Sequence, residues 1–101
     1  MPPSKPLKVL LSNTADVGIQ TIAHYLANRF SDTLAIHYVN ALESAFDMLA
    51  NMPTLGMVFQ GDIRRLIWKK YTLIFYKYDG NFLYITNVED SRSNYLLKFL
   101  S

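Results

Sequence analysis

The spacing of apolar side chains changes about halfway along the chain, from a helical period to strand-like runs. In the first half, apolar residues recur at every third or fourth position over residues 15–30 and again over residues 33–52. This period places them along one face of an α-helix. The two apolar stripes consist of Ile19, Ile22, Ala23, Leu26 and Phe30 in the first stretch, and Ala35, Val39, Leu42, Phe46 and Leu49 in the second. We therefore predict two amphipathic helices.

Residues that cap or end helices mark the limits of both stretches. Ser12-Asn13-Thr14 offers N-caps for the first helix, and Ser31-Asp32 offers a cap pair between the two. Pro53 is expected to end the second helix because proline lacks a backbone N–H. Gly18 is expected to weaken the first helix by ~1 kcal/mol relative to alanine. Because the break between the helices is so short, we expect an antiparallel hairpin.

The second half is rich in β-branched and aromatic residues, which favour strands. Asp79-Gly80 interrupts it, and this pair is typical of a hairpin turn between two apolar runs. We predict three antiparallel strands here, at residues 63–69, 71–78 and 82–89. A short apolar run at residues 7–12 is expected to add a strand that joins this sheet.

A length of 101 residues suits one domain. We expect residues 1–6, which include three prolines, to form a disordered lead, and residues 7–101 to form a single α+β domain. Its order is an N-terminal strand, an antiparallel two-helix hairpin and a three-stranded antiparallel sheet. The apolar run at residues 95–100 either packs on the sheet as a short helix or leaves as a tail. The residues expected to be buried between helices and sheet are Ile22, Leu26, Leu42, Phe46, Leu49, Ile74 and Ile85.

Composition argues against several kinds of chemistry. The chain has no cysteine, which excludes disulfides and thiolate ligands and fits a reducing cytoplasm. Its two histidines, His24 and His37, belong to no metal-binding motif, so we expect no metal. No nucleophile elbow or glycine-rich phosphate loop is present, so we expect neither a nucleophilic hydrolase nor a nucleotide cofactor. The N-terminal apolar run is too short for a signal peptide, and no run approaches the ~20 apolar residues of a membrane helix.

Basic residues gather around the first of the three predicted strands, although the net charge of the chain is only +2. They are Arg64, Arg65, Lys69 and Lys70, and aromatic residues stand on the neighbouring strands. Such a surface can bind phosphates and stacked bases. From composition alone, a solvated strand edge over an aromatic core is the favoured interpretation.

Two residues after the last predicted strand have a similar choice of roles. Arg92 could face the basic strand, or it could pair with Asp90 or Glu89 in a surface ion pair. Tyr95 is better suited to packing than to acid–base chemistry, because an unperturbed phenol has a pKa near ~10.

Five short segments, in order, resemble the RelE/ParE toxins of bacterial type II toxin–antitoxin systems. The resemblance covers about Val9 to Arg92, and its parts are ordinary when taken singly but characteristic in this order. The segments are Ile22-Ala23-His24-Tyr25-Leu26; the helix opened by Ala35 and continued by Leu42, Phe46 and Leu49; Met52-Pro53-Thr54-Leu55-Gly56; Ile63-Arg64-Arg65 with Tyr71-Thr72-Leu73-Ile74-Phe75-Tyr76; and Ile85 through Arg92.

The resemblance implies one of two targets. RelE-like members cut mRNA in the ribosomal A site without a metal, whereas ParE-like members inhibit DNA gyrase. The RelE-like pattern has an arginine directly after the tyrosine that opens the second strand of the hairpin, but here Tyr71 is followed by Thr72. No histidine lies near the carboxyl terminus, and the long helical hairpin is closer to the ParE branch. We therefore favour a ParE-like gyrase inhibitor, with the ribosome-dependent nuclease as the alternative.

The resemblance also implies partners and candidate site residues. The target would be bound through Arg64, Arg65, Lys69, Lys70 and Arg92, and in a nuclease the catalytic candidates would be Arg64, Arg65, Lys69, Arg92 and Tyr95. The expected partners are a cognate antitoxin, in a toxin–antitoxin hetero-oligomer, and either gyrase or the ribosome with its mRNA. No cofactor is expected. A cytoplasmic protein that arrests growth and stabilises a plasmid fits this reading, and so does a non-toxic scaffold that only binds an antitoxin.

Overall fold

The structure is a computed structural model, and it describes residues 5–92. The elements are β1 (Lys8–Leu11), α1 (Asn13–Arg29), α2 (Asp32–Asn51), β2 (Met57–Gln60), β3 (Ile63–Trp68), β4 (Thr72–Tyr78) and β5 (Phe82–Asp90). The predicted packing of residues 95–100, most of the predicted N-terminal lead and the candidate Tyr95 lie outside the described residues.

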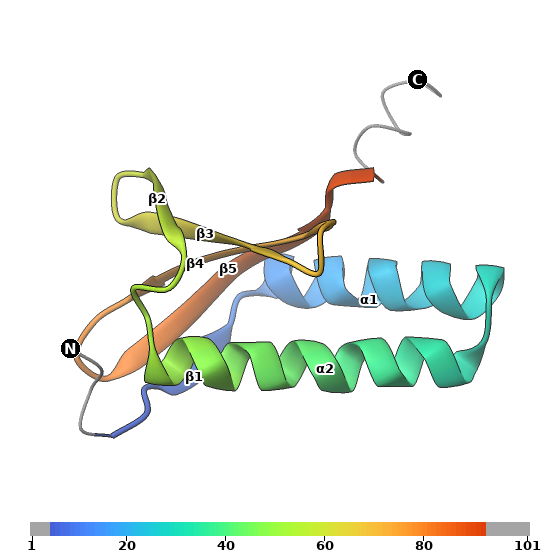
Figure 1. The fold of residues 1–101 in the computed structure, drawn as a ribbon, viewed down its shortest axis with the longest axis horizontal. Helices are drawn as coiled ribbons and strands as arrows, with labels where there is room; N and C mark the ends of the chain where they lie inside the picture. The colour runs from blue at the N-terminus through green and yellow to red at the C-terminus, as the bar shows by residue number, and fades with distance from the viewer. Residues whose placement is uncertain (1–4, 93–101) are drawn as a thin grey trace.

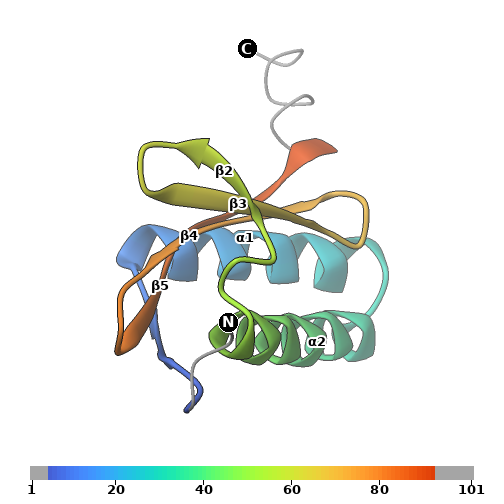
Figure 2. The same cartoon turned by 60° about the vertical axis from the view of Figure 1, so that its left-hand side comes forward.

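The strands form one five-stranded sheet in the order β1-β5-β4-β3-β2. β1 runs parallel to β5, and the other neighbours are antiparallel. Helices α1 and α2 lie side by side on one face of the sheet (Figures 1 and 2). The predicted α+β class, the helical hairpin and the joining of the N-terminal strand are confirmed.

The prediction of three strands after the helices is wrong, because four follow them. The additional strand is β2, whose four residues are all exposed. A strand with no buried alternate residues lacks the alternation by which a strand is recognised. The sequence nevertheless contained a signal for this strand. Gly61-Asp62 forms the turn between β2 and β3, with Gly61 at φ +58°, and Gly-Asp is a known hairpin pair.

Both helices begin at a serine that caps them. The hydroxyl of Ser12 accepts a hydrogen bond from the Ala15 N–H at 2.9 Å, and the hydroxyl of Ser31 accepts one from the Leu34 N–H at 3.0 Å. Ser12 also donates to the carbonyl of Thr86 at 2.6 Å, which ties the start of α1 to β5. α1 ends one residue earlier than predicted, at Arg29.

The core lies between the helical hairpin and the sheet. The predicted core residues are buried except Leu26, which is half-buried against the core, and the largest fully buried side chains are Tyr76, Leu42, Leu49, Ile74, Leu83, Ile85 and Val88. Phe30 was expected on the apolar stripe of α1 but is 65% exposed. It is the C-cap residue with non-helical backbone angles, so its side chain leaves the helix face where the chain turns towards α2.

Candidate functional site

The face of the sheet opposite the helices carries exposed apolar side chains. We call it the open face and define it by Met57, Phe59, Arg65, Ile67, Leu73 and Phe75, which strand register and ring contact place on one side. No helix or strand within residues 5–92 covers this face (Figure 2). Met57 is 79% exposed and Ile67 is 57% exposed, which is unusual for large apolar side chains that share one surface.

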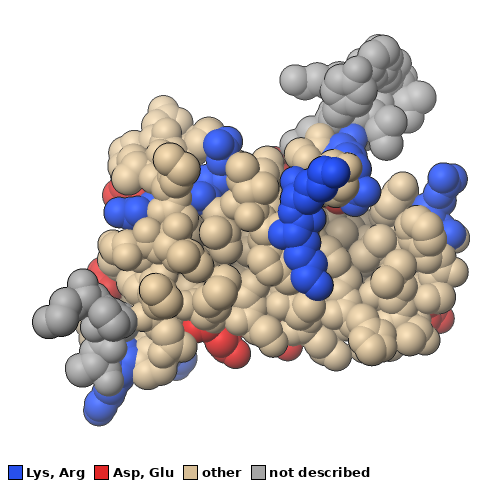
Figure 3. Space-filling model, in the orientation of Figure 1, with Lys and Arg blue, Asp and Glu red and all other residues tan. Residues whose placement is uncertain are grey.

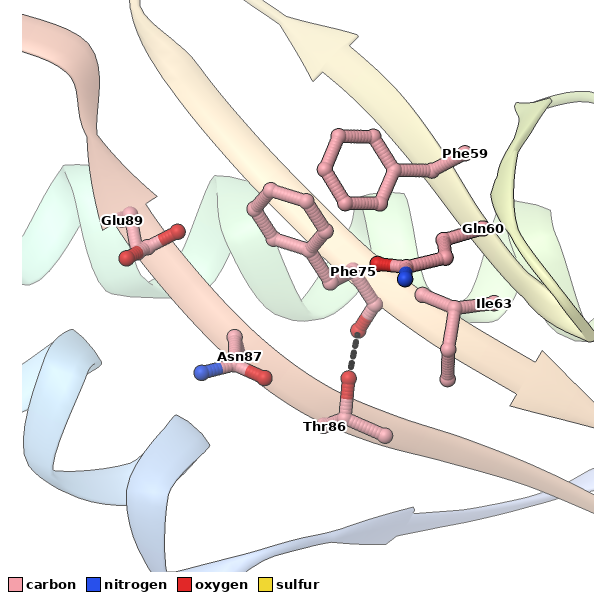
Figure 4. A pocket seen from close by; sticks show the side chains of 7 residues that line it. All are labelled: Phe59, Gln60, Ile63, Phe75, Thr86, Asn87 and Glu89. Carbon is pink, nitrogen blue, oxygen red and sulfur yellow. Dashed lines mark hydrogen bonds between the residues drawn. The ribbon is translucent and has the colours of Figure 1, made fainter.

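A shallow hollow of ≈ 440 Å³ lies on the open face (Figure 4). The rings of Phe59 and Phe75 meet edge to face at 5.1 Å and form its apolar wall. Thr86 donates a hydrogen bond to the Phe75 carbonyl at 3.1 Å, so the hydroxyl proton is engaged within the sheet. The hollow is lined by Phe59, Gln60, Ile63, Phe75, Thr86, Asn87 and Glu89. An apolar wall beside amide and carboxylate groups suits a peptide side chain better than a reaction centre.

Arg64 and Arg65, adjacent in sequence, lie on opposite faces of the sheet because side chains alternate along a strand. Arg64 shares a face with Tyr76 and donates from Nη1 to the carbonyls of Gly56 at 2.7 Å and Thr54 at 3.4 Å. It therefore holds the loop that follows α2. Arg65 lies on the open face, with its guanidinium 5.1 Å from the Phe59 ring.

Lys69, Lys70 and Arg92 come together at the other end of β3, where they form what we call the Tyr71 cluster, together with Tyr71 itself. Lys70 lies 5.3 Å and Arg92 lies 4.1 Å from the centre of the Tyr71 ring, and Lys69 lies 5.1 Å from the centre of the adjacent Trp68 ring. Both lysines are at positive φ, 49° and 73°, in the turn between β3 and β4. Figure 3 shows basic side chains gathered at this end of the sheet.

Arg92 is held in place by Asp90. The Asp90 carboxylate accepts hydrogen bonds from Arg92 Nη2 at 2.9 Å, from Nε at 3.2 Å and from the backbone N–H at 2.8 Å. The carboxylate is buried, whereas 53% of the arginine side chain is exposed. Hydrogen bonding to Asp90 raises the pKa of Arg92 above its already high ordinary value. The predicted ion pair with Asp90 is confirmed, and about half of the arginine side chain stays exposed.

Thr72 does not belong to an exposed surface. It is only 3% exposed, and its hydroxyl shares a hydrogen bond of 2.5 Å with the Tyr38 hydroxyl from α2. Burial raises the pKa of Tyr38, so this phenol stays protonated at neutral pH. Tyr38 also packs edge to face on Trp68, with ring centres 5.6 Å apart. These contacts connect α2 to the base of the Tyr71 cluster.

The structure therefore divides the predicted target-binding residues into three separate places. Lys69, Lys70 and Arg92 are together, Arg65 is on the open face, and Arg64 supports a loop. The sequence did not indicate that Phe59 contributes to the open face, because β2 was not predicted. It also did not indicate that the Tyr71 ring lies beside Lys70 and Arg92. In the described part of the chain, no group of three or more His, Cys, Asp or Glu side chains could hold a metal ion. No helix there is long and apolar enough to cross a membrane.

Comparison with known proteins gives the family. A sequence profile described as "ParE toxin of type II toxin-antitoxin system, parDE" matches residues 9–95. The chain belongs to the ParE toxin family. A solved chain from the chromosomal ParDE toxin–antitoxin system of P. aeruginosa shares the fold, with a TM-score of 0.72 over 83% of this chain and 95% of that one, at 11% identity. No curated protein sequence is significantly similar to the chain.

Proposed function

We propose that this protein is the toxin of a type II toxin–antitoxin module, that it arrests growth by binding DNA gyrase, and that a cognate antitoxin neutralises it. The observation that carries the proposal is the family match over residues 9–95, almost the whole chain. Residues 7–101 would then act as one toxin domain in the cytoplasm, where gyrase works.

The surroundings of Thr72 support binding rather than RNA cleavage as the mechanism. Cleavage of RNA without a metal requires charged groups preorganised around the scissile phosphate, and loss of one such group lowers rates by ~10²–10³. At the position after Tyr71, the chain has a buried threonine bonded to Tyr38. Arg64 and Arg65 lie on opposite faces of the sheet, so they could not act together on one phosphate.

Two assays run side by side test the target. We expect the purified toxin to inhibit supercoiling by gyrase and to leave mRNA intact on translating ribosomes. Site-specific cuts in translated mRNA with gyrase unaffected would overturn the proposal in favour of the nuclease. Absence of both activities, together with no growth arrest on expression, would indicate a scaffold that only binds an antitoxin.

The open face is the proposed site for the antitoxin. Its apolar side chains and the hollow walled by Phe59 and Phe75 suit an antitoxin segment that orders as it binds and covers apolar surface. A protein that is monomeric at high concentration and binds no hydrophobic dye would remove the basis for this assignment.

Two exposed phenylalanines offer a matched test of the antitoxin site. Phe59 lies on the open face and Phe30 lies at the tip of the helical hairpin, with 50% and 65% exposure. We expect Phe59→Ser to weaken antitoxin binding, measured by calorimetry, and Phe30→Ser to leave it unchanged. Equal effects of the two substitutions would place the antitoxin elsewhere.

A further inference from the structure

The Tyr71 cluster differs from the open face in chemistry. The open face offers apolar side chains, whereas the cluster offers positive charge carried on aromatic rings. Lys70 and Arg92 both lie within 5.3 Å of the centre of the Tyr71 ring, so two charges are concentrated on one support. Asp90, two residues before Arg92, is already engaged by it in an ion pair.

The Arg92 guanidinium is oriented for an external anion. Its Nε and Nη2 atoms donate to Asp90, while Nη1 has no hydrogen-bond partner among the described residues. The Asp90 pair and the Tyr71 ring restrict the side chain, so less conformational entropy is lost when an anion binds. Arginine and lysine together are typical ligands of phosphate oxygens.

Two features favour a nucleic-acid backbone over an acidic protein as the partner. Lysine is depleted from the centres of protein interfaces, which are built around apolar and aromatic residues in desolvated pockets. Here Lys69 and Lys70 are exposed, and cations already lie over the supporting rings of Trp68 and Tyr71. Rings occupied in this way are poorly placed to stack on bases, so the contact would read charge and not sequence.

The turn that carries the lysines adds a structural reason. Both residues have positive φ, a conformation that costs energy for residues other than glycine. The Tyr71 N–H donates to the Lys69 carbonyl at 2.8 Å within the same turn. Such a tight turn presents two consecutive ammonium groups at the end of the β3–β4 hairpin, close to the end of β5, after which Arg92 follows.

From these observations we propose that Lys69, Lys70 and Arg92 form a binding site for the phosphodiester backbone of a nucleic acid, with Asp90 as the positioning residue for Arg92. The site binds through charge, has no sequence preference and catalyses no reaction. This property goes beyond gyrase inhibition and does not depend on it.

Fluorescence anisotropy with a labelled DNA duplex tests the proposal on the full chain, without gyrase. For three phosphate contacts we expect affinity to fall ~40-fold between about 50 and 200 mM salt. Lys70→Ala and Arg92→Ala should each weaken binding and reduce the slope of log affinity against log salt by about 1. A labelled single-stranded RNA in a parallel titration distinguishes the two sources of phosphate, and binding of either supports the site.

Lys77→Ala is the matched control. Lys77 also lies over a tyrosine ring, at 6.0 Å from the centre of Tyr84, but it is on the far part of β4 from the cluster. The Lys77→Ala variant should bind the duplex as the unchanged chain does, because charges separated by more than ~8 Å are screened at physiological salt. Because Lys70 is exposed and makes no ion pair among the described residues, Lys70→Ala should fold normally, which circular dichroism would verify.

Three results would overturn the proposal. One is undiminished binding by the Lys70→Ala and Arg92→Ala variants. Another is an equal loss with Lys77→Ala, which would indicate attraction by net charge alone. The third is tighter binding of a labelled polyglutamate than of either nucleic acid, which would assign the cluster to an acidic protein. Failure of gyrase inhibition in the supercoiling assay leaves all these readouts unchanged.

Discussion

Gly18 of α1 lies against the backbone of Val88 in β5, so closely that a Cβ on Gly18 would stand 2.1 Å from the Val88 carbonyl oxygen. From sequence, this glycine is only a cost to the helix. In the fold it is the residue that lets α1 pack directly onto the sheet, since any side chain would collide with a strand backbone that cannot move aside easily.

Gly18→Ala should therefore destabilise the protein, although alanine is the better helix former. Helix propensity alone predicts a gain of ~1 kcal/mol, whereas overpacking typically costs ~1–3 kcal/mol or more. Urea unfolding followed by circular dichroism would measure the sign. Gly80→Ala is the control, because a Cβ there meets nothing within 4 Å and the change should stay within about 0.5 kcal/mol. A stabilised Gly18→Ala protein would contradict the packing of α1 on β5.

Phe46→Ala should cost ~3–5 kcal/mol in the free energy of unfolding, because it leaves a large cavity in the core. Phe46 is 4% exposed in α2 and belongs to the core cluster. Phe30→Ala deletes the same atoms from a side chain that is 65% exposed, and we expect a loss below about 1 kcal/mol. Equal losses at the two positions would mean that the register of the helical hairpin is wrong.

These two positions also show how far the sequence could be read. Phe46 lies in the middle of a strongly periodic helix, where spacing alone determines the buried face. Phe30 lies at a helix end, where one non-helical residue turns the side chain away, and periodicity does not report that. Gly18 and β2 were misread for a related reason. A close approach to another element, or pairing at an exposed sheet edge, is a tertiary property with little local signal.

The candidate site was less predictable than the fold. Sequence placed Arg64 and Arg65 in one basic cluster because they are neighbours in the chain. Strand alternation separates them, and the contacts that decide their roles, with Gly56 and Phe59, come from the loop after α2 and from the unpredicted β2. The pairing of Arg92 with Asp90 was among the expected alternatives because the two residues are close in sequence.

Tyr76→Phe tests the buried hydroxyl that holds the loop after α2. The Tyr76 hydroxyl donates to the Pro53 carbonyl at 2.7 Å and accepts from the Gly56 N–H at 2.8 Å. Its removal leaves two buried backbone groups without that partner, which should cost ~1–3 kcal/mol. Tyr78→Phe is the control, since Tyr78 is 36% exposed and we expect a change within about 0.5 kcal/mol.

The same hydroxyl predicts a dependence of stability on alkaline pH. Burial raises the pKa of Tyr76 above its ordinary value of 10.0. The folded protein therefore holds this proton more tightly than the unfolded chain does. Its contribution is complete below pH 10.0 and is lost as the pH rises through the folded-state pKa. Urea midpoints should fall less steeply above pH 10.0 in Tyr76→Phe than in the unchanged protein, and parallel curves would contradict the burial of this phenol.

The two neighbouring arginines should differ in what they affect. Arg64→Ala removes two hydrogen bonds to loop carbonyls and should lower stability by ~1–2 kcal/mol. Arg65→Ala should leave the melting temperature nearly unchanged and reduce toxicity in a growth assay. Arg92→Ala should also reduce toxicity, but it should lower the melting temperature because it removes the ion pair with the buried Asp90 carboxylate. Lysine should be a poor replacement at either position if the contact is bidentate. Full toxicity of the Arg65→Ala/Arg92→Ala double variant would mean that these side chains are only a solvated surface.

Asp90→Asn separates the positioning of charge from its amount. The substitution removes a negative charge, so attraction by net charge alone predicts tighter binding to a DNA duplex. The positioning of Arg92 by Asp90 predicts the opposite, because asparagine cannot form the charged pair that Nε and Nη2 make with the carboxylate. We expect the anisotropy titration to show affinity reduced by about 3-fold, which corresponds to ~0.7 kcal/mol, within the range measured for exposed ion pairs. The titration should be paired with urea unfolding, since Asp90 is 8% exposed and the variant must be shown to fold. A folded Asp90→Asn protein that binds DNA more tightly would show that the carboxylate only reduces the charge of the cluster and does not orient Arg92.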